Sequence, residues 1–221
     1  MWCIPVAGAA FVAAMEPILD LYELAYDPAR PLVCFDETSK QLIEETRLAL
    51  PASPGQVRRY DYEYKRNGTR NLFLFFEPLA GWRHVEVTER RTKLDFAHQM
   101  RWLVDVARPD VDYIKVVFDN LNTHTYAALY EAFEPAEARR LARKLVFHYT
   151  PKHASWLNMA EIEFSVIMRK LGRYVPDEQS LKRKVKAIEL SRNQSQSSVD
   201  WQFTADDARI KLKRLYPSTS S

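Results

Sequence analysis

Cysteine is scarce in this sequence: only Cys3 and Cys34 occur among its 221 residues. Two thiols cannot complete a four-ligand structural zinc site, and they form no disulfide pattern like that of small secreted domains. A zinc module and a disulfide scaffold are therefore both excluded. We expect a protein of the reducing cytoplasm.

Long hydrophobic runs are also missing. The apolar stretch near the start, from Ile4 to Ala14, is too short to span a bilayer. No basic segment precedes it, as one does in a secretory signal peptide. We therefore expect no signal peptide and no membrane partner.

The chain lacks a strong excess of either charge. It carries 32 Lys and Arg against 29 Asp and Glu, which gives a net charge of +3 and a pI of about 8.8. This mildly basic balance permits nucleic-acid binding without arguing for it. Internal repeats are missing, and low complexity is limited to short serine-rich stretches. With 47% hydrophobic residues, one domain with one sizeable core is expected.

The stretch from His148 to Glu163 has the pattern of a strand end, a proline-containing loop and a helix. Apolar residues with the spacing of one buried helical face follow at Leu157, Ala160, Phe164, Ile167, Met168 and Leu171. At about 100° per residue, Glu161 lies about 70° from the centre of that face. Glu163 lies on the other flank, about 160° from Glu161. At most one of the two glutamates can join a given site.

Two apolar segments each end in an aspartate, Asp36 after residues 32–35 and Asp119 after residues 113–118. Each segment is typical of a buried strand. Two such aspartates near Glu161 would repel one another and raise their pKa values. Mg²⁺ prefers carboxylate oxygens and is the natural partner of such a cluster. The alternative without a functional site is that these acids only occur at strand ends and helix starts, where they are common as caps.

With these motifs in register, the sequence resembles the catalytic domain of the mariner superfamily of DDE transposases, in particular its bacterial insertion-sequence branch. The matching segments are Cys34-Phe35-Asp36-Glu37, Phe118-Asp119-Asn120-Leu121-Asn122-Thr123-His124 and His148 through Glu161. The resemblance extends from about Trp2 to Tyr216. Its pattern Leu157-Asn158-x-x-Glu161 selects Glu161 over Glu163 as the third carboxylate. Glu37 would point to the opposite strand face, at the surface or behind the site.

The order of predicted elements favours an α/β protein of the ribonuclease-H-like fold, a mixed five-stranded sheet with helices on both faces. Strands are expected at 32–36, 71–77, 82–87, 113–118 and 145–149. Helices are expected at 9–25, 92–107, 124–132, 135–144, 176–192 and 205–215, besides the one that carries Glu161. The first and fourth strands would lie side by side. One catalytic domain would fill 1–221, with a core of about 31–172, and the helix-turn-helix domain of full-length relatives is expected to be absent.

The resemblance implies DNA cleavage at the ends of a mobile element and joining of the freed 3′-hydroxyl to target DNA, at TA dinucleotides. It implies Asp36, Asp119 and Glu161 as catalytic residues and ligands of two Mg²⁺ ions, for which Mn²⁺ can substitute. DNA is the expected partner, bound by a homodimer at the bacterial nucleoid. The alternatives are another ribonuclease-H-like nuclease, or a DNA-binding remnant without activity. The Leu-Asn-x-x-Glu pattern opposes the first, and retention of all three carboxylates opposes the second.

Further residues are candidates for supporting roles. Asn120, Asn122 and His124 can orient a carboxylate or hold water near the metal, or serve only as turn and cap residues. Basic residues and tyrosines alternate along residues 58–66, which suits nucleic acid but also fits a solvated hairpin. The candidates for DNA contact are Arg58, Arg59, Lys65, Arg66, Lys152, His153, Arg169, Lys170 and Arg173. A solvated charged face is the alternative for the last three.

Overall fold

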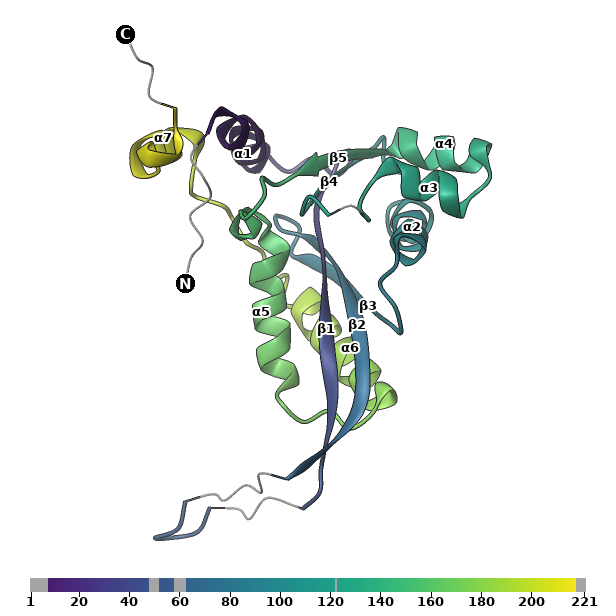
Figure 1. Cartoon of the computed structure of the whole chain (residues 1–221), viewed down its shortest axis with the longest axis vertical. Coiled ribbons are helices and arrows are strands. Elements are labelled where there is room, and N and C mark those ends of the chain that lie inside the picture. Colours follow the sequence, from purple (N-terminus) through teal and green to yellow (C-terminus); the bar gives the residue numbers. More distant parts are fainter. Residues whose placement is uncertain (1–7, 48–51, 58–62, 122, 218–221) are drawn as a thin grey trace.

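Five strands of the described residues form one mixed sheet (Figure 1). The computed structural model describes residues 8–47, 52–57, 63–121 and 123–217. The strand order is β3-β2-β1-β4-β5, with β1 antiparallel to β2 and parallel to β4. The strands are β1 (Leu32–Glu45), β2 (Tyr64–Glu77), β3 (Trp82–Thr88), β4 (Ile114–Phe118) and β5 (Leu145–Tyr149). The predicted fold class and the adjacency of the first and fourth strands are confirmed.

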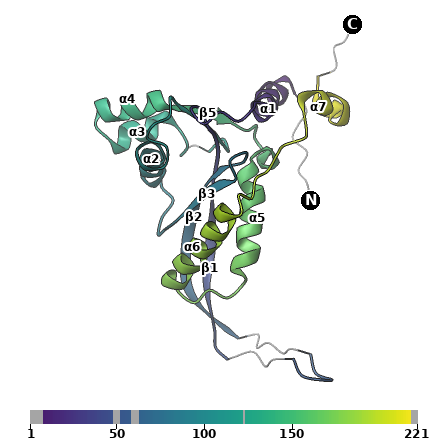
Figure 2. The same cartoon turned by 180° about the vertical axis from the view of Figure 1, so that it is seen from behind.

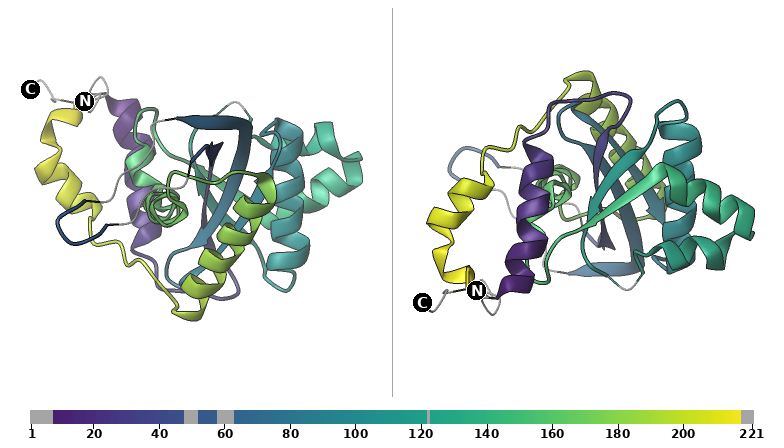
Figure 3. Two further views of the ribbon diagram at one scale, coloured as in Figure 1. Left: turned by 90° about the horizontal axis from the view of Figure 1, so that it is seen from below. Right: turned by 90° about the horizontal axis from the view of Figure 1, so that it is seen from above.

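Helices pack on both faces of this sheet, as predicted (Figures 1 and 3). One face carries α2 (Lys93–Trp102), α3 (Tyr126–Ala132) and α4 (Pro135–Lys144); the other carries α1 (Ala9–Tyr22), α5 (Met159–Leu171) and α6 (Glu178–Gln194). The last helix, α7 (Ala205–Lys211), lies beside α1 (Figure 2). In the ranges that the structure describes, no helix is long and apolar enough to cross a bilayer.

The alternation of strand side chains divides the core into two clusters, one on each face of the sheet. Along β1, Cys34 belongs to the cluster shared with α1 and α5, whereas Val33 and Phe35 belong to the cluster shared with α2. Successive strand residues point to opposite faces. Asp36 therefore continues the face that α5 covers, and Glu37 continues the face that α2 covers.

The strands β1 and β2 extend beyond β3 as a two-stranded arm, formed by residues 40–45 and 64–70 (Figure 1). The apolar runs predicted a first strand ending at residue 36 and a second beginning at residue 71, so this extension was not predicted. In the extension only Leu42 is buried. Backbone pairing with β2, and not burial, therefore lengthens the strand, and a pattern based on burial misses it.

Several helix bounds differ by a few residues from the sequence prediction, and two of these differences are in the first two predicted helices. The first helix ends at Tyr22 and not at residue 25, where exposed side chains such as Leu24 offer no burial to hold another turn. The helix predicted for 92–107 is an α-helix only to Trp102, followed by a π-helical turn at Leu103–Ala107. Neither difference moves the strands that carry the two aspartates.

Candidate functional site

Two aspartates lie just beyond the paired segments of two adjacent parallel strands, Asp36 within β1 and Asp119 directly after β4. The parallel register pairs Cys34 with Val117, and Asp36 and Asp119 each lie two residues further along. Because β1 and β4 run in the same direction, the residues just beyond their pairing meet at one edge of the parallel part of the sheet, where α/β proteins commonly place their sites. The topology therefore brings Asp36 and Asp119 together.

Burial and neighbouring negative charges raise the pKa values of both carboxyl groups. Burial and then the negative charge of Asp119 raise the pKa of Asp36 from 3.8 to about 8, with Glu161 adding to the effect. Burial likewise raises the pKa of Asp119, and the charge of Glu161 raises it further. The Glu37 amide opposes the shift by donating a 2.8 Å hydrogen bond to Asp36 Oδ1. A cation bound between the two carboxyl groups would stabilise their ionised forms.

With a chelator present, we expect Asp36 to make the protein less stable as the pH rises from about 4 to about 8. Its pKa is higher in the folded chain than the ordinary value of 3.8, so the folded state holds the proton more tightly. That contribution is complete below the unfolded pKa and is lost as the pH rises through the folded pKa. Urea unfolding at the two ends of this window measures it. Asp36→Asn should flatten the decline, and equal slopes for both proteins would contradict the assignment.

The helix α5 presents its two glutamates in opposite directions. Glu161 lies in the first turn and is exposed, and its charge acts on both Asp36 and Asp119. Glu163 is buried against Arg83 and Arg192, on the other side of the helix. The helical wheel placed Glu163 at the edge of the core. The structure covers that edge with β3 and α6, so the side chain is enclosed.

The donor atoms at this edge fit a hard divalent cation. Asp36, Asp119 and Glu161 offer only carboxylate oxygens, which Mg²⁺ and Mn²⁺ accept. The raised pKa values of the two aspartates also favour a cation at this position, because a bound cation would relieve the repulsion between the carboxylates. Within the described ranges, no three His, Cys, Asp or Glu side chains already lie close enough to hold a metal ion together.

Two further polar side chains anchor this site, Thr150 and Asn158, for which no role was predicted from the sequence. Thr150 Oγ1 donates a 3.1 Å hydrogen bond to Asp119 Oδ1. Asn158 caps α5 by accepting from the Ala160 amide at 3.1 Å, and its Nδ2 donates to the Phe35 carbonyl at 2.9 Å. Asn158 thus ties the start of the Glu161 helix to the residue that precedes Asp36. The signal for both was their place in the quoted motifs.

Of the three predicted supporting residues, His124 has the clearest position. It is buried, with Nδ1 at 3.3 Å from the Asp119 carbonyl and Nε2 at 2.8 Å from Glu37 Oε2. It therefore links the end of β4 to the middle of β1 on the α2 face. Glu37 is enclosed by this contact and does not lie at the surface. Asn120 is exposed, and Asn122 lies outside the described residues.

The candidate DNA-binding residues are only partly brought together. The guanidinium carbons of Arg66 and Arg173 lie 5.7 and 5.2 Å from the ring centroid of Tyr64, where the arm meets the end of α5. Lys65 on the same arm is 3.5 Å from Glu44. The exposed residues Arg169 and Lys170 are in the last turn of α5, and Lys152 and His153 are exposed in the loop after β5. Arg58 and Arg59 lie outside the described residues. Basic groups thus occur near both ends of α5.

Comparison with known proteins gives a family match and a fold match. Residues 31–182 match the family described as DDE superfamily endonuclease. The solved Mos1 strand transfer complex is 15% identical with a TM-score of 0.59, over 85% of this chain and 55% of that one. The Mos1 mariner paired end complexes with Mn and with Mg are each 15% identical, with TM-scores of 0.57 and 0.61.

The chain covers only part of each of the solved chains that it matches. The complexes with Mn and with Mg match over 84% and 100% of this chain, and over 56% and 66% of those chains. This chain therefore spans between about half and two thirds of the solved chains that it matches. At this level of identity the likeness establishes a shared fold. No curated protein matches the chain significantly.

Proposed function

The chain belongs to the DDE superfamily endonuclease family, and we propose that it is the catalytic part of a DNA transposase of the mariner type. It would cut DNA strands at the ends of a bacterial insertion sequence and join the freed 3′-hydroxyls to target DNA. The observation that carries the proposal is the juxtaposition of Asp36 and Asp119, each two residues beyond the last parallel pair of β1 and β4. The start of α5, with Glu161, stands over the same edge.

Asp36, Asp119 and Glu161 would hold two divalent cations, Mg²⁺ or Mn²⁺. When bound, such a pair activates the attacking oxygen of a phosphodiester reaction and stabilises the leaving oxygen. The remaining groups hold the carboxylates in place. Thr150 fixes one oxygen of Asp119. Asn158 fixes the start of α5 relative to β1, which sets the distance between Glu161 and the aspartates.

The DNA partner is supported by the basic residues at the two ends of α5 and by the structures that the fold resembles. Those structures are described as paired end and strand transfer complexes of Mos1. We propose that this chain binds both element ends and target DNA, and that it acts on them as a homodimer. Its insertions would be at TA dinucleotides, and it would work at the bacterial nucleoid.

Nicking of supercoiled plasmid DNA tests the proposed activity directly. We expect nicking in Mg²⁺ or Mn²⁺ that a chelator abolishes. We also expect an oligonucleotide with a free 3′-hydroxyl to be joined to the plasmid. An RNA–DNA hybrid and a four-way DNA junction serve as competing substrates. A clear preference for either would replace the transposase with a different ribonuclease-H-like nuclease. Protein that binds DNA and never cleaves it would indicate a remnant without activity.

We expect the chain to bind DNA mainly through phosphates, with little sequence preference and a steep decline in affinity with salt. Each phosphate contact removed should reduce the slope of log K against log salt by about 1. Arg169→Ala combined with Lys170→Ala is the test. Arg139→Ala combined with Arg143→Ala is the control, because these exposed residues lie on α4, away from α5 (Figure 1). A marked preference for the ends of one element, or equal slopes for both double variants, would contradict this expectation.

A further inference from the structure

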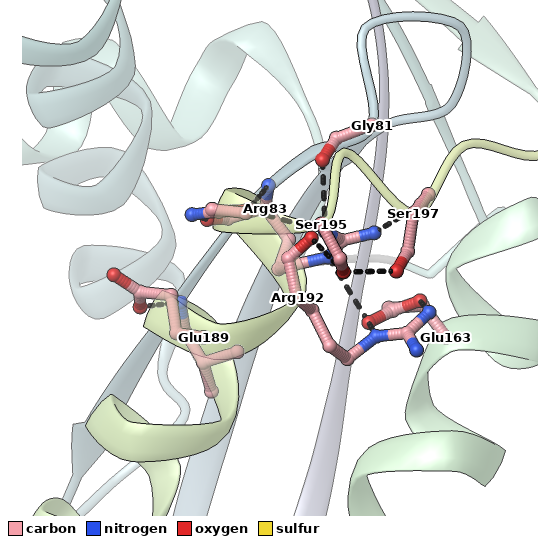
Figure 4. Close-up of polar contacts among 9 residues, drawn as sticks. Gly81, Arg83, Glu163, Glu189, Arg192, Ser195 and Ser197 are labelled. Atoms are coloured by element: carbon pink, nitrogen blue, oxygen red, sulfur yellow. Dashed lines mark hydrogen bonds and ion pairs between the residues drawn. The ribbon is translucent and has the colours of Figure 1, made fainter.

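The helix that carries Glu161 is held on its opposite side by a buried ion cluster of Arg83, Glu163 and Arg192 (Figure 4). Arg192 donates two parallel hydrogen bonds of 2.6 Å to the two oxygens of Glu163. Arg83 Nε lies 3.1 Å from Glu163 Oε1. The side chains of Glu163 and Arg83 are 1% and 0% exposed, so water does not compete for these contacts. The cluster joins α5, α6 and β3.

Arg83 is itself fixed on several sides. Its Nη1 donates to the Gly81 carbonyl at 2.8 Å and lies 3.2 Å from Asn193 Oδ1. Its Nη2 donates to the Ser197 carbonyl, and its guanidinium carbon lies 5.2 Å from the centroid of the Phe76 ring. These partners come from the turn before β3, from β2 and from the end of α6. Arg83 is therefore a rigid anchor, and it cannot follow Glu163 if α5 turns.

The direction of Glu163 determines the direction of Glu161. Two residues apart on a helix, the side chains point about 160° away from each other. The helix α5 packs on β1 and β2. Glu163 reaches from there toward β3 and α6, so Glu161 is directed the other way, toward β4 and Asp119. In the sheet order, β3 and β4 lie on opposite sides of the β2-β1 pair.

We infer that Glu163 is a positioning residue for the proposed reaction. Its contacts with Arg83 and Arg192 fix the rotation of α5 about its own axis, and thereby aim Glu161 at Asp36 and Asp119. The inference rests on the proposed function, because it assigns Glu161 a part in the site. Asn158 supplies the complementary restraint, since its bond to the Phe35 carbonyl holds the start of the helix against β1.

An ion cluster suits this role better than an apolar contact would. Apolar packing depends little on direction, whereas two parallel hydrogen bonds between a guanidinium and a carboxylate specify an orientation. Buried ion pairs are often no more stabilising than apolar side chains of the same volume. Stability alone therefore does not account for placing Glu163, Arg83 and Arg192 in the core. A requirement for one rotation of α5 accounts for it.

A matched pair of variants separates positioning from stability. Glu163→Gln keeps the shape of the side chain but weakens its pairing with both arginines. Glu189→Gln is the control, because Glu189 is also buried and also joins α6 to β3. Its Oε2 accepts from the Val85 amide at 3.0 Å and lies 3.3 Å from His84 Nδ1. These contacts join α6 to β3 and do not involve α5. Both variants should lower the midpoint of thermal unfolding.

The two variants should differ in cation binding and in catalysis. At a temperature where circular dichroism shows both folded, Mn²⁺ alone is titrated by calorimetry and plasmid nicking is timed at saturating DNA. We expect Glu163→Gln to weaken Mn²⁺ affinity and slow the maximal rate by about 10- to 100-fold, as losses of ligand-orienting partners do. Glu189→Gln should retain wild-type values. Arg192→Lys, which keeps the charge but loses the paired hydrogen bonds, should fall between them.

The outcomes distinguish this inference from the function on which it rests. If Glu163→Gln and Glu189→Gln bind Mn²⁺ and nick DNA equally, Glu163 serves stability alone and the inference is wrong. If Glu163→Gln fails to fold, Arg192→Lys decides, and wild-type Mn²⁺ affinity in that variant overturns the inference. A wild-type protein that binds Mn²⁺ and nicks DNA while Glu163→Gln does the same overturns only the positioning role. A wild-type protein that does neither overturns the proposed function and this inference with it.

Discussion

Asp119→Asn is expected to reduce metal-dependent DNA cleavage to background while the protein stays folded. Asp119 directly follows β4 and lies beside Asp36, so its loss removes one of the two strand-borne charges that would hold a cation. An asparagine oxygen can still accept the 3.1 Å hydrogen bond from Thr150, so the local structure should persist. With the repulsion gone, the pKa of Asp36 should move back toward its ordinary value.

Asp119→Asn should therefore have two opposite effects, one on cleavage and one on stability, that can be measured together. Plasmid nicking in Mg²⁺ should disappear, while the thermal midpoint with chelator above the pKa of Asp36 should be unchanged or higher. Asp112→Asn is the control, because Asp112 is exposed and lies before the start of β4, at the end away from Asp119. Its Oδ2 lies 3.2 Å from Arg30 Nε. That variant should cleave like the wild type. Cleavage by Asp119→Asn at the wild-type rate would show that the site is elsewhere.

The sequence was sufficient for the elements that bury apolar residues on both sides. The segments Val33–Phe35 and Val116–Phe118 are fully buried, and their continuous apolar runs predicted both strands and the aspartates that follow. The topology then predicted that these strands are neighbours. The arm was not predictable in the same way, because residues 40–45 and 64–70 are held by pairing with each other and bury little.

The surroundings of the site depended on contacts between residues far apart in the chain. A helical wheel describes only α5, so it could not show that Arg83 and Arg192 would enclose Glu163. Nor could strand alternation show that Glu37 would meet His124, which comes from the segment after β4. Local periodicity gives the direction of a side chain relative to its own element. Which charge it meets there is decided by the tertiary structure.

Glu161→Gln is expected to lose metal-dependent cleavage to background without losing stability. Glu161 is exposed in the first turn of α5, so a neutral side chain of the same size disturbs no buried contact. It does remove the charge that acts on Asp36 and Asp119, and with it the third carboxylate available to a cation. Unfolding with chelator present should therefore match the wild type, while nicking and Mn²⁺ affinity fall.

Comparison with Glu163→Gln makes this assignment decisive, because the two glutamates are two residues apart and face opposite sides of one helix. Glu163→Gln should destabilise the fold, because it weakens the buried ion cluster, and should keep measurable cleavage, because it removes no carboxylate of the proposed site. Glu161→Gln should do the reverse. Glu161→Asp, which keeps the charge and shortens the reach, should retain part of the rate. An active, stable Glu161→Gln beside an inactive Glu163→Gln would move the third carboxylate to Glu163, and a helix turned by about 160° would then be required to bring it to Asp119.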